Sequence, residues 1–108
     1  MKLVRGIVRE EQVFNIIDAL ERTGTSGITV TSVHGRGVNR QTAYHRGLPY
    51  PALTEMRAIE VIACDNAADD IARVMVDVAH TGSKGDGHVF VIPIDDCYAV
   101  RTRWREQA

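Results

Sequence analysis

The first third of the chain changes its hydrophobic period once. Apolar and polar residues alternate from Leu3 to Arg9, which is typical of a strand. The next apolar residues follow the i, i+3, i+4, i+7 spacing of an amphipathic helix, at Val13, Ile16, Ile17 and Leu20. Gly24 is expected to end this helix, and the β-branched run from Ile28 to Val33 predicts a second strand. A strand–helix–strand unit is therefore predicted over residues 3–33.

The second half of the chain repeats this order of elements. The run from Arg57 to Cys64 predicts a strand, and Asp65 or Asn66 is expected to cap the helix that follows. The apolar face of that helix consists of Ile71, Val74, Met75 and Val78. Gly82 is expected to end it, before a strand from Val89 to Ile92.

Two such units predict an α+β fold of the ferredoxin-like kind, a double βαβ sandwich with an antiparallel sheet. Both helices are expected to cover one face of the sheet. The other face would expose apolar strands on a single copy, so we expect it to be buried against further copies of the chain. Residues Tyr98–Arg101 are a candidate for a short additional strand.

Between the two units lies a segment without any period, residues 34–55. It is rich in residues that break helices and strands, namely Gly35, Gly37, Gly47, Pro49 and Pro51. A loop of about twenty residues is uncommon in a compact domain and is usually functional or mobile. The alternative is an extended hairpin connection with no chemical role.

The composition narrows the class of protein. Of 108 residues, 44% are hydrophobic and 25% charged, with a net charge of -1, which excludes a disordered chain and predicts one domain over residues 1–108. The near-neutral balance argues against a dedicated nucleic-acid-binding protein. No apolar run approaches the roughly 20 residues that span a bilayer, and no signal peptide is recognisable, so we expect a cytoplasmic protein. Cys64 and Cys97 form no disulfide framework.

The segment Thr81–His88 holds three glycines within six residues, together with Lys84. Such a loop can form a nest of backbone N–H groups that holds phosphate, and its alternative interpretation is a plain turn. An RNA-binding element on the same fold needs aromatic residues where this chain has Asp86 and His88, which argues against that function.

Other candidate chemistry is sparse. The four histidines and two cysteines lack the ligand spacing of a zinc site, and no catalytic triad or carboxylate pair is recognisable. We expect no enzyme and no metal; a metal site at a subunit interface is the alternative. Glu60 lies in an apolar strand and needs a partner or a ligand, unless it is exposed on the open face of the sheet. The arginines at the end of the chain form either a solvated tail or a phosphate clamp.

Several segments together resemble the PII signal-transduction proteins along nearly the whole chain. The most specific is Thr81–Pro93. The others, in matching order and spacing, are Gly27–Thr31, Val33–Gly37, Tyr44–Gly47, Ile59–Ile62 and Val100–Thr102. The resemblance implies a homotrimer of ferredoxin-like subunits that binds adenine nucleotides in three clefts between subunits. It also implies a T-loop at about residues 35–55, a phosphate-cradling B-loop at residues 81–88 and a C-terminal segment at residues 97–108.

The resemblance further implies which residues line the nucleotide cleft. The adenine would lie near Ile7, Thr29, Glu60 and Ile62. The phosphates would meet Gly35, Arg36, Gly37, Gly85, Asp86, Gly87, His88 and Arg101, with Arg103 as a further candidate. The ligand would be ADP, AMP or ATP, and no other cofactor is expected.

The chain departs from the PII pattern at positions that hold charge in most members. His88 and Met56 stand where most members carry lysine, and Ala99 replaces one of two arginines of the C-terminal strand. Arg103 takes the place of a glycine, and either Asn39 or Gln41 takes the place of a metal-site glutamine. These changes indicate a divergent PII-like branch.

The function that the resemblance implies is a signalling protein that controls a membrane transporter or a metabolic enzyme through its T-loop. A small effector such as bicarbonate or 2-oxoglutarate would act together with the nucleotide. The protein would bind no nucleic acid and would not itself be embedded in a membrane. The alternative is a trimeric protein similar to CutA, which would bind divalent metal through histidine and cysteine.

Overall fold

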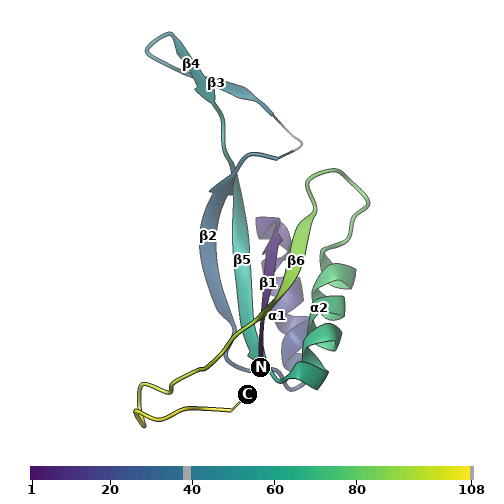
Figure 1. The fold of residues 1–108 in the computed structure, drawn as a ribbon. Coiled ribbons are helices and arrows are strands. Elements are labelled where there is room, and N and C mark those ends of the chain that lie inside the picture. Colours follow the sequence, from purple (N-terminus) through teal and green to yellow (C-terminus); the bar gives the residue numbers. More distant parts are fainter. Residues whose placement is uncertain (38–39, 108) are drawn as a thin grey trace.

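A computed structural model describes residues 1–37 and 40–107. Its main sheet has four antiparallel strands in the order β2-β5-β1-β6, with two helices on one face (Figure 1). The strands are β1 (Lys2–Val8), β2 (Thr29–Gly35), β5 (Thr54–Ala63) and β6 (Gly87–Pro93). The helices are α1 (Val13–Arg22), preceded by a 3-10 turn η1 (Glu10–Gln12), and α2 (Asp65–Ala79). The predicted ferredoxin-like double βαβ fold is confirmed.

The core lies between the sheet and the two helices. Alternate residues of the two central strands point to the helices and are buried, including Val4, Val8, Ile59 and Val61. The facing helix residues Ile16, Leu20 and Met75 are fully buried, as their helical spacing predicts. The periodicity thus identified the face that each element buries.

The opposite face of the sheet is uncovered in a single chain. It carries the alternate residues of each strand that do not point to the helices. On this face Ile7 is paired with His88, and Arg5 is paired with Phe90. Apolar side chains remain accessible there, with Phe90 45% exposed. Glu60 lies on this face, and its carboxylate pairs with the Arg5 guanidinium at 3.2 Å. Glu60 therefore has a protein partner.

The start of α2 differs from the prediction. The helix begins at Asp65, its N-cap residue is Cys64, and no side-chain oxygen at the cap accepts a hydrogen bond from an amide of the first turn. Both side chains have other partners. Asp65 pairs with the amino group of Met1, and Asn66 accepts a hydrogen bond from the Cys64 thiol at 2.8 Å. A tertiary contact of Asp65 and a local contact of Asn66 thus replace the predicted capping.

Residues 34–55 are not the aperiodic loop that the glycines and prolines predict. Two further strands, β3 (Thr42–His45) and β4 (Leu48–Pro51), form a hairpin that projects beyond the sheet (Figure 1). Arg46 and Gly47 connect them with φ of 50° and 78°, as a tight two-residue hairpin turn requires. The alternative of a hairpin connection is therefore correct for the described part of this segment. Asn39 lies outside the described residues.

The hairpin should open far more readily than the sheet. Its two strands pair only with each other, and an isolated pair of strands is marginally stable in water. We expect the amide protons of residues 42–51 to exchange quickly in the free protein, whereas those of residues 71–78 in α2 stay protected. Hydrogen exchange read by NMR measures this difference. Equal protection in both segments would contradict a mobile docking loop.

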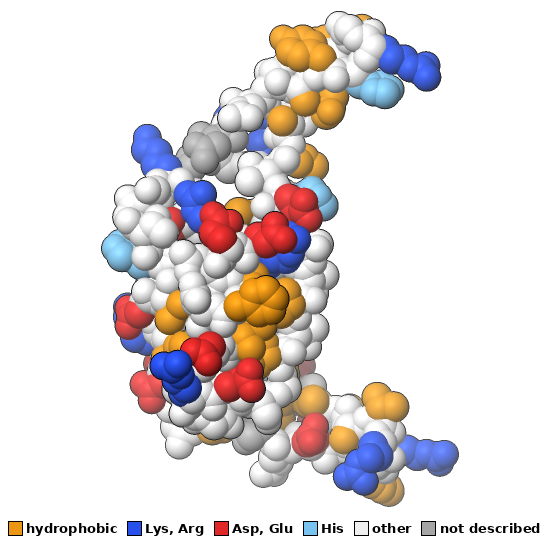
Figure 2. Space-filling view, turned by 180° about the vertical axis from the view of Figure 1, so that it is seen from behind, with side chains coloured by type: hydrophobic (Ala, Val, Ile, Leu, Met, Phe, Trp, Pro, Cys, Tyr) orange, Lys and Arg blue, Asp and Glu red, His pale blue; other side chains and the backbone are white. Residues whose placement is uncertain are grey.

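The C-terminal segment folds back on itself instead of forming a strand at Tyr98–Arg101. The Ala99 amide donates to the Trp104 carbonyl at 2.9 Å, and the only pairing found there among described residues is a single bridge between Tyr98 and Arg105. Val100 is 95% exposed, and apolar side chains gather on this segment and on the hairpin (Figure 2).

Within residues 1–37 and 40–107, no helix is long and apolar enough to cross a membrane.

Candidate functional site

A cleft of about 450 Å³ opens where the start of β6, the segment Thr81–His88 and the base of the hairpin segment meet. Eight residues that the sequence predicted to contact nucleotide line this one cleft. They are Ile7, Gly35, Arg36, Gly37, Gly85, Asp86, Gly87 and His88. These residues come from three separated segments, and the antiparallel strand order β2-β5-β1-β6 brings them together.

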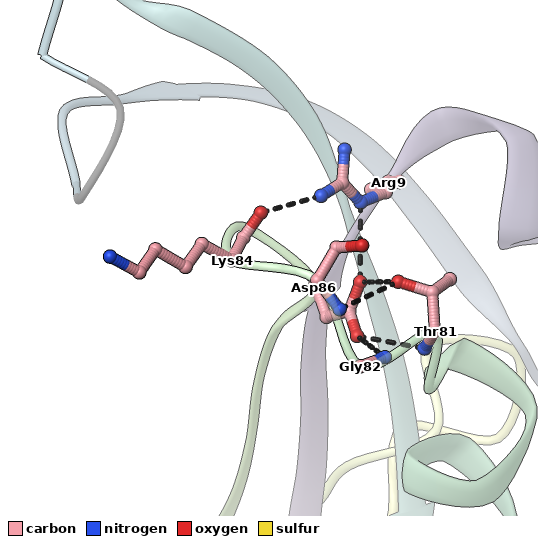
Figure 3. Close-up of polar contacts among 6 residues, drawn as sticks. Arg9, Thr81, Gly82, Lys84 and Asp86 are labelled. Carbon is pink, nitrogen blue, oxygen red and sulfur yellow. Dashed lines mark hydrogen bonds and ion pairs between the residues drawn. The ribbon is translucent and has the colours of Figure 1, made fainter.

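The segment Thr81–His88 is organised around the Asp86 side chain (Figure 3). The carboxylate accepts hydrogen bonds from the amide of Thr81 at 2.8 Å, from the amide of Gly82 at 3.0 Å and from the Thr81 hydroxyl. Its side chain is only 20% exposed. Asp86 therefore shapes the loop from inside, and its backbone is the part left to face a ligand.

The same hydrogen bonds keep Asp86 ionised. The Thr81 hydroxyl contributes most, followed by the backbone amides of Thr81 and Gly82 and by Arg9, and together they lower the pKa of Asp86 from 3.8 to about 2. A carboxyl with a lowered pKa stabilises the folded state above its unfolded value and loses this effect as the pH falls toward 2. The loop is thus held by a full negative charge at neutral pH.

Gly87 permits the loop to enter the sheet. Its φ is 106°, and a Cβ built there would lie 1.8 Å from the carbonyl oxygen of Ile7. Only glycine combines this backbone conformation with so close an approach. The glycine-rich composition of the loop therefore has a specific structural cause at this position.

Side chains that line the cleft also contact other parts of the same chain. Arg36 donates to the carbonyl oxygens of Gln41 at 3.0 Å and Ala52 at 3.5 Å, and so joins both sides of the hairpin base. The His88 ring stacks on Phe90 with centroids 6.2 Å apart. Arg9 also lines the cleft, although the sequence analysis missed it. In the sequence, Arg9 is marked only by its position as a charged residue directly after the predicted strand.

Three predicted adenine contacts lie outside this cleft. Thr29 and Glu60 are paired in the ladder between β2 and β5 on the open face. Ile62 lines a second groove of about 630 Å³ at the opposite end of the sheet, together with Gly27, Cys64 and part of the C-terminal segment. One chain therefore carries the predicted site residues at two separate places.

Arg101 and Arg103 lie on the C-terminal segment. This segment leaves the sheet at the end opposite to Thr81–His88, which is called the glycine loop below (Figure 1). Neither residue lines the cleft formed by Gly35–Gly37 and Gly85–His88 of its own chain. Arg103 has a φ of 71°, a left-handed conformation that costs a non-glycine residue about 1–2 kcal/mol. The glycine that PII proteins carry here fits this conformation.

Two further features bear on ligand chemistry. Met56 lines the cleft and gives it an apolar wall where most PII proteins have lysine. Among the residues that the structure describes, no three histidine, cysteine, aspartate or glutamate side chains are grouped so as to hold a metal ion.

Comparison with known proteins agrees with this geometry. The family model for nitrogen regulatory protein P-II matches residues 1–104. Nitrogen regulatory protein GlnK2 of Haloferax mediterranei is 36% identical over 104 residues, covering 94% of this chain and 85% of that protein. Nitrogen regulatory protein P-II 2 of Methanothermobacter thermautotrophicus is 37% identical over 106 residues, covering 94% and 90%.

A third relative is the nitrogen fixation nifHD region glnB-like protein 1 of Methanococcus maripaludis, 36% identical over 107 residues that cover 95% of this chain and 96% of that protein. These matches give no support to the alternative of a CutA-like metal-binding protein. The chain belongs to the P-II family of nitrogen regulatory proteins, whose members are trimeric regulators and not enzymes.

Proposed function

We propose that this protein is a nucleotide-responsive signalling subunit. It binds ADP, AMP or ATP in clefts between the subunits of a trimer, and it controls a partner protein through the T-loop at residues 35–55. The observation that carries the proposal is the single cleft lined by eight predicted site residues, with the glycine loop at one wall and the base of the hairpin at the other. A phosphate in this cleft would contact both segments.

The distribution of the remaining site residues supports a site between subunits. Ile62 and the C-terminal arginines lie at the end of the sheet opposite to the phosphate cleft, so one chain cannot bring them to the same ligand. A ring of copies joined through the open sheet faces would place this end of one subunit beside the phosphate cleft of the next. In that arrangement Arg101 of a neighbouring subunit clamps the phosphates as a bidentate donor.

The hairpin is the proposed docking element. It exposes Tyr44, Leu48 and Tyr50 beside the cations Arg40 and Arg46. Such a projecting surface suits a membrane transporter or a metabolic enzyme as partner, with bicarbonate or 2-oxoglutarate as a second effector. We place this activity in the cytoplasm, where adenine nucleotides report the energy state.

ADP is expected to bind at least as tightly as ATP. Met56 and Ala99 replace two cations that would otherwise hold a third phosphate, and each charged contact is worth about 1.5–3 kcal/mol, or about ten- to a hundredfold in affinity. Calorimetry with ADP and ATP measures the preference, and Met56→Lys should shift it toward ATP. Wild-type protein that binds no adenine nucleotide at millimolar concentration would refute the proposed function.

A further inference from the structure

Arg9 lies directly after β1 and lines the cleft, and Figure 3 shows its side chain beside the glycine-rich segment Thr81–His88. Its Nη2 donates to the carbonyl oxygen of Lys84 at 2.7 Å, and its Nε donates to the Asp86 carboxylate at 3.4 Å. The side chain is 30% exposed, which makes it one of the more sheltered charges of the molecule. Arg9 therefore ties the end of β1 to the middle of the loop.

The contacts of Arg9 leave part of its guanidinium available. A guanidinium has five N–H donors on three nitrogens in a fixed plane. In Figure 3 the third nitrogen, Nη1, points away from both loop partners, and no hydrogen bond from it is found among the described residues. Arg36, the other arginine of this cleft, already donates to two carbonyl oxygens of the hairpin base.

We propose that Arg9 is a further phosphate-binding residue of the nucleotide site. Its Nε and Nη2 hold the glycine loop in the conformation that Asp86 shapes, and Nη1 donates to a phosphate oxygen of the nucleotide. Because an arginine is charged at every physiological pH, Arg9 supplies a constant attraction for phosphate. This inference rests on the proposed nucleotide-binding function.

Arg9→Gln tests the role, because glutamine removes the charge and the fork of donors while keeping a polar side chain. We expect the Kd for ADP to rise by about ten- to a hundredfold, as loss of a charged hydrogen bond predicts, whereas the Kd for adenosine stays unchanged. Arg9→Lys keeps the charge but not the fork, and it should recover part of the ADP affinity. Arg22→Gln, which removes a surface arginine paired with Asp18 on α1, is the matched control and should bind ADP as the wild type does.

Amide exchange of Lys84–Gly87 in the nucleotide-free protein reports the positioning contacts separately. It should speed up in Arg9→Gln and not in Arg22→Gln. An ADP affinity equal to that of the wild type, or an equal loss for ADP and adenosine, would overturn the phosphate contact. Unchanged amide exchange would overturn the positioning contact. These outcomes differ from failure of the proposed function, in which the wild-type protein itself binds no ADP.

Discussion

Gly87→Ala is expected to destabilise the protein by at least about 2 kcal/mol, because backbone strain and overpacking each cost about 1–3 kcal/mol. The added Cβ would lie 1.8 Å from the carbonyl oxygen of Ile7 and 2.9 Å from its carbonyl carbon, so the backbone itself must move. The first pairs between β6 and β1 would be lost, and with them the wall of the cleft. Urea denaturation measures the change in the free energy of unfolding.

Gly24→Ala provides the control for this substitution. Gly24 also has a left-handed φ, at 84°, but a Cβ there meets nothing within 4 Å. The cost should therefore be limited to backbone strain of about 1–2 kcal/mol. If Gly24→Ala and Gly87→Ala destabilise equally, the close approach to Ile7 has no energetic weight. If Gly87→Ala remains fully stable, the geometry at the start of β6 is wrong.

Phe90→Asp is expected to dissociate the trimer into monomers. Phe90 lies on the face of the sheet that the helices leave open, and a carboxylate buried there between subunits would be desolvated without a partner. Light scattering should give a mass of 11.9 kDa for the variant and three times this value for the wild type. ADP binding should be lost as well, because each proposed site needs two subunits.

Phe14→Asp is the matched control, with the same change of side chain on α1. Phe14 is 82% exposed on the side of the molecule away from the open sheet face. This variant should remain a trimer and should bind ADP. Dissociation of both variants would indicate a general loss of stability, and a trimeric Phe90→Asp would show that the open face does not carry the subunit contact.

The hairpin shows where reasoning from composition failed. Glycine and proline at five positions of residues 34–55 predicted an irregular loop, since these residues weaken regular elements. Gly47 is instead required by a turn with positive φ, and the prolines of β4 lie on a two-stranded sheet whose edges are open to solvent. Glycine and proline can thus either interrupt a strand or form part of a tight hairpin, and only the strand that pairs with them decides which of these occurs.

Asp86 and Glu60 illustrate a second limit. The resemblance to PII proteins placed both residues near a nucleotide. Each has an ion-pair partner distant in sequence, Arg9 for Asp86 and Arg5 for Glu60, although Asp86 also accepts hydrogen bonds from its sequence neighbours Thr81 and Gly82. Both pairs form because β1 lies between β5 and β6 in the sheet. Sequence order alone contains no such adjacency.

The sequence by itself determined the alternation of strands and helices and the face that each element buries. These features follow from local periodicity, so they can be recognised without a fold. Only the tertiary structure decided the partner of each charge, the hairpin within the T-loop and the division of the predicted site between two ends of one chain. Those features depend on antiparallel pairing between segments far apart in the sequence, where contact energy, and not local preference, selects the conformation.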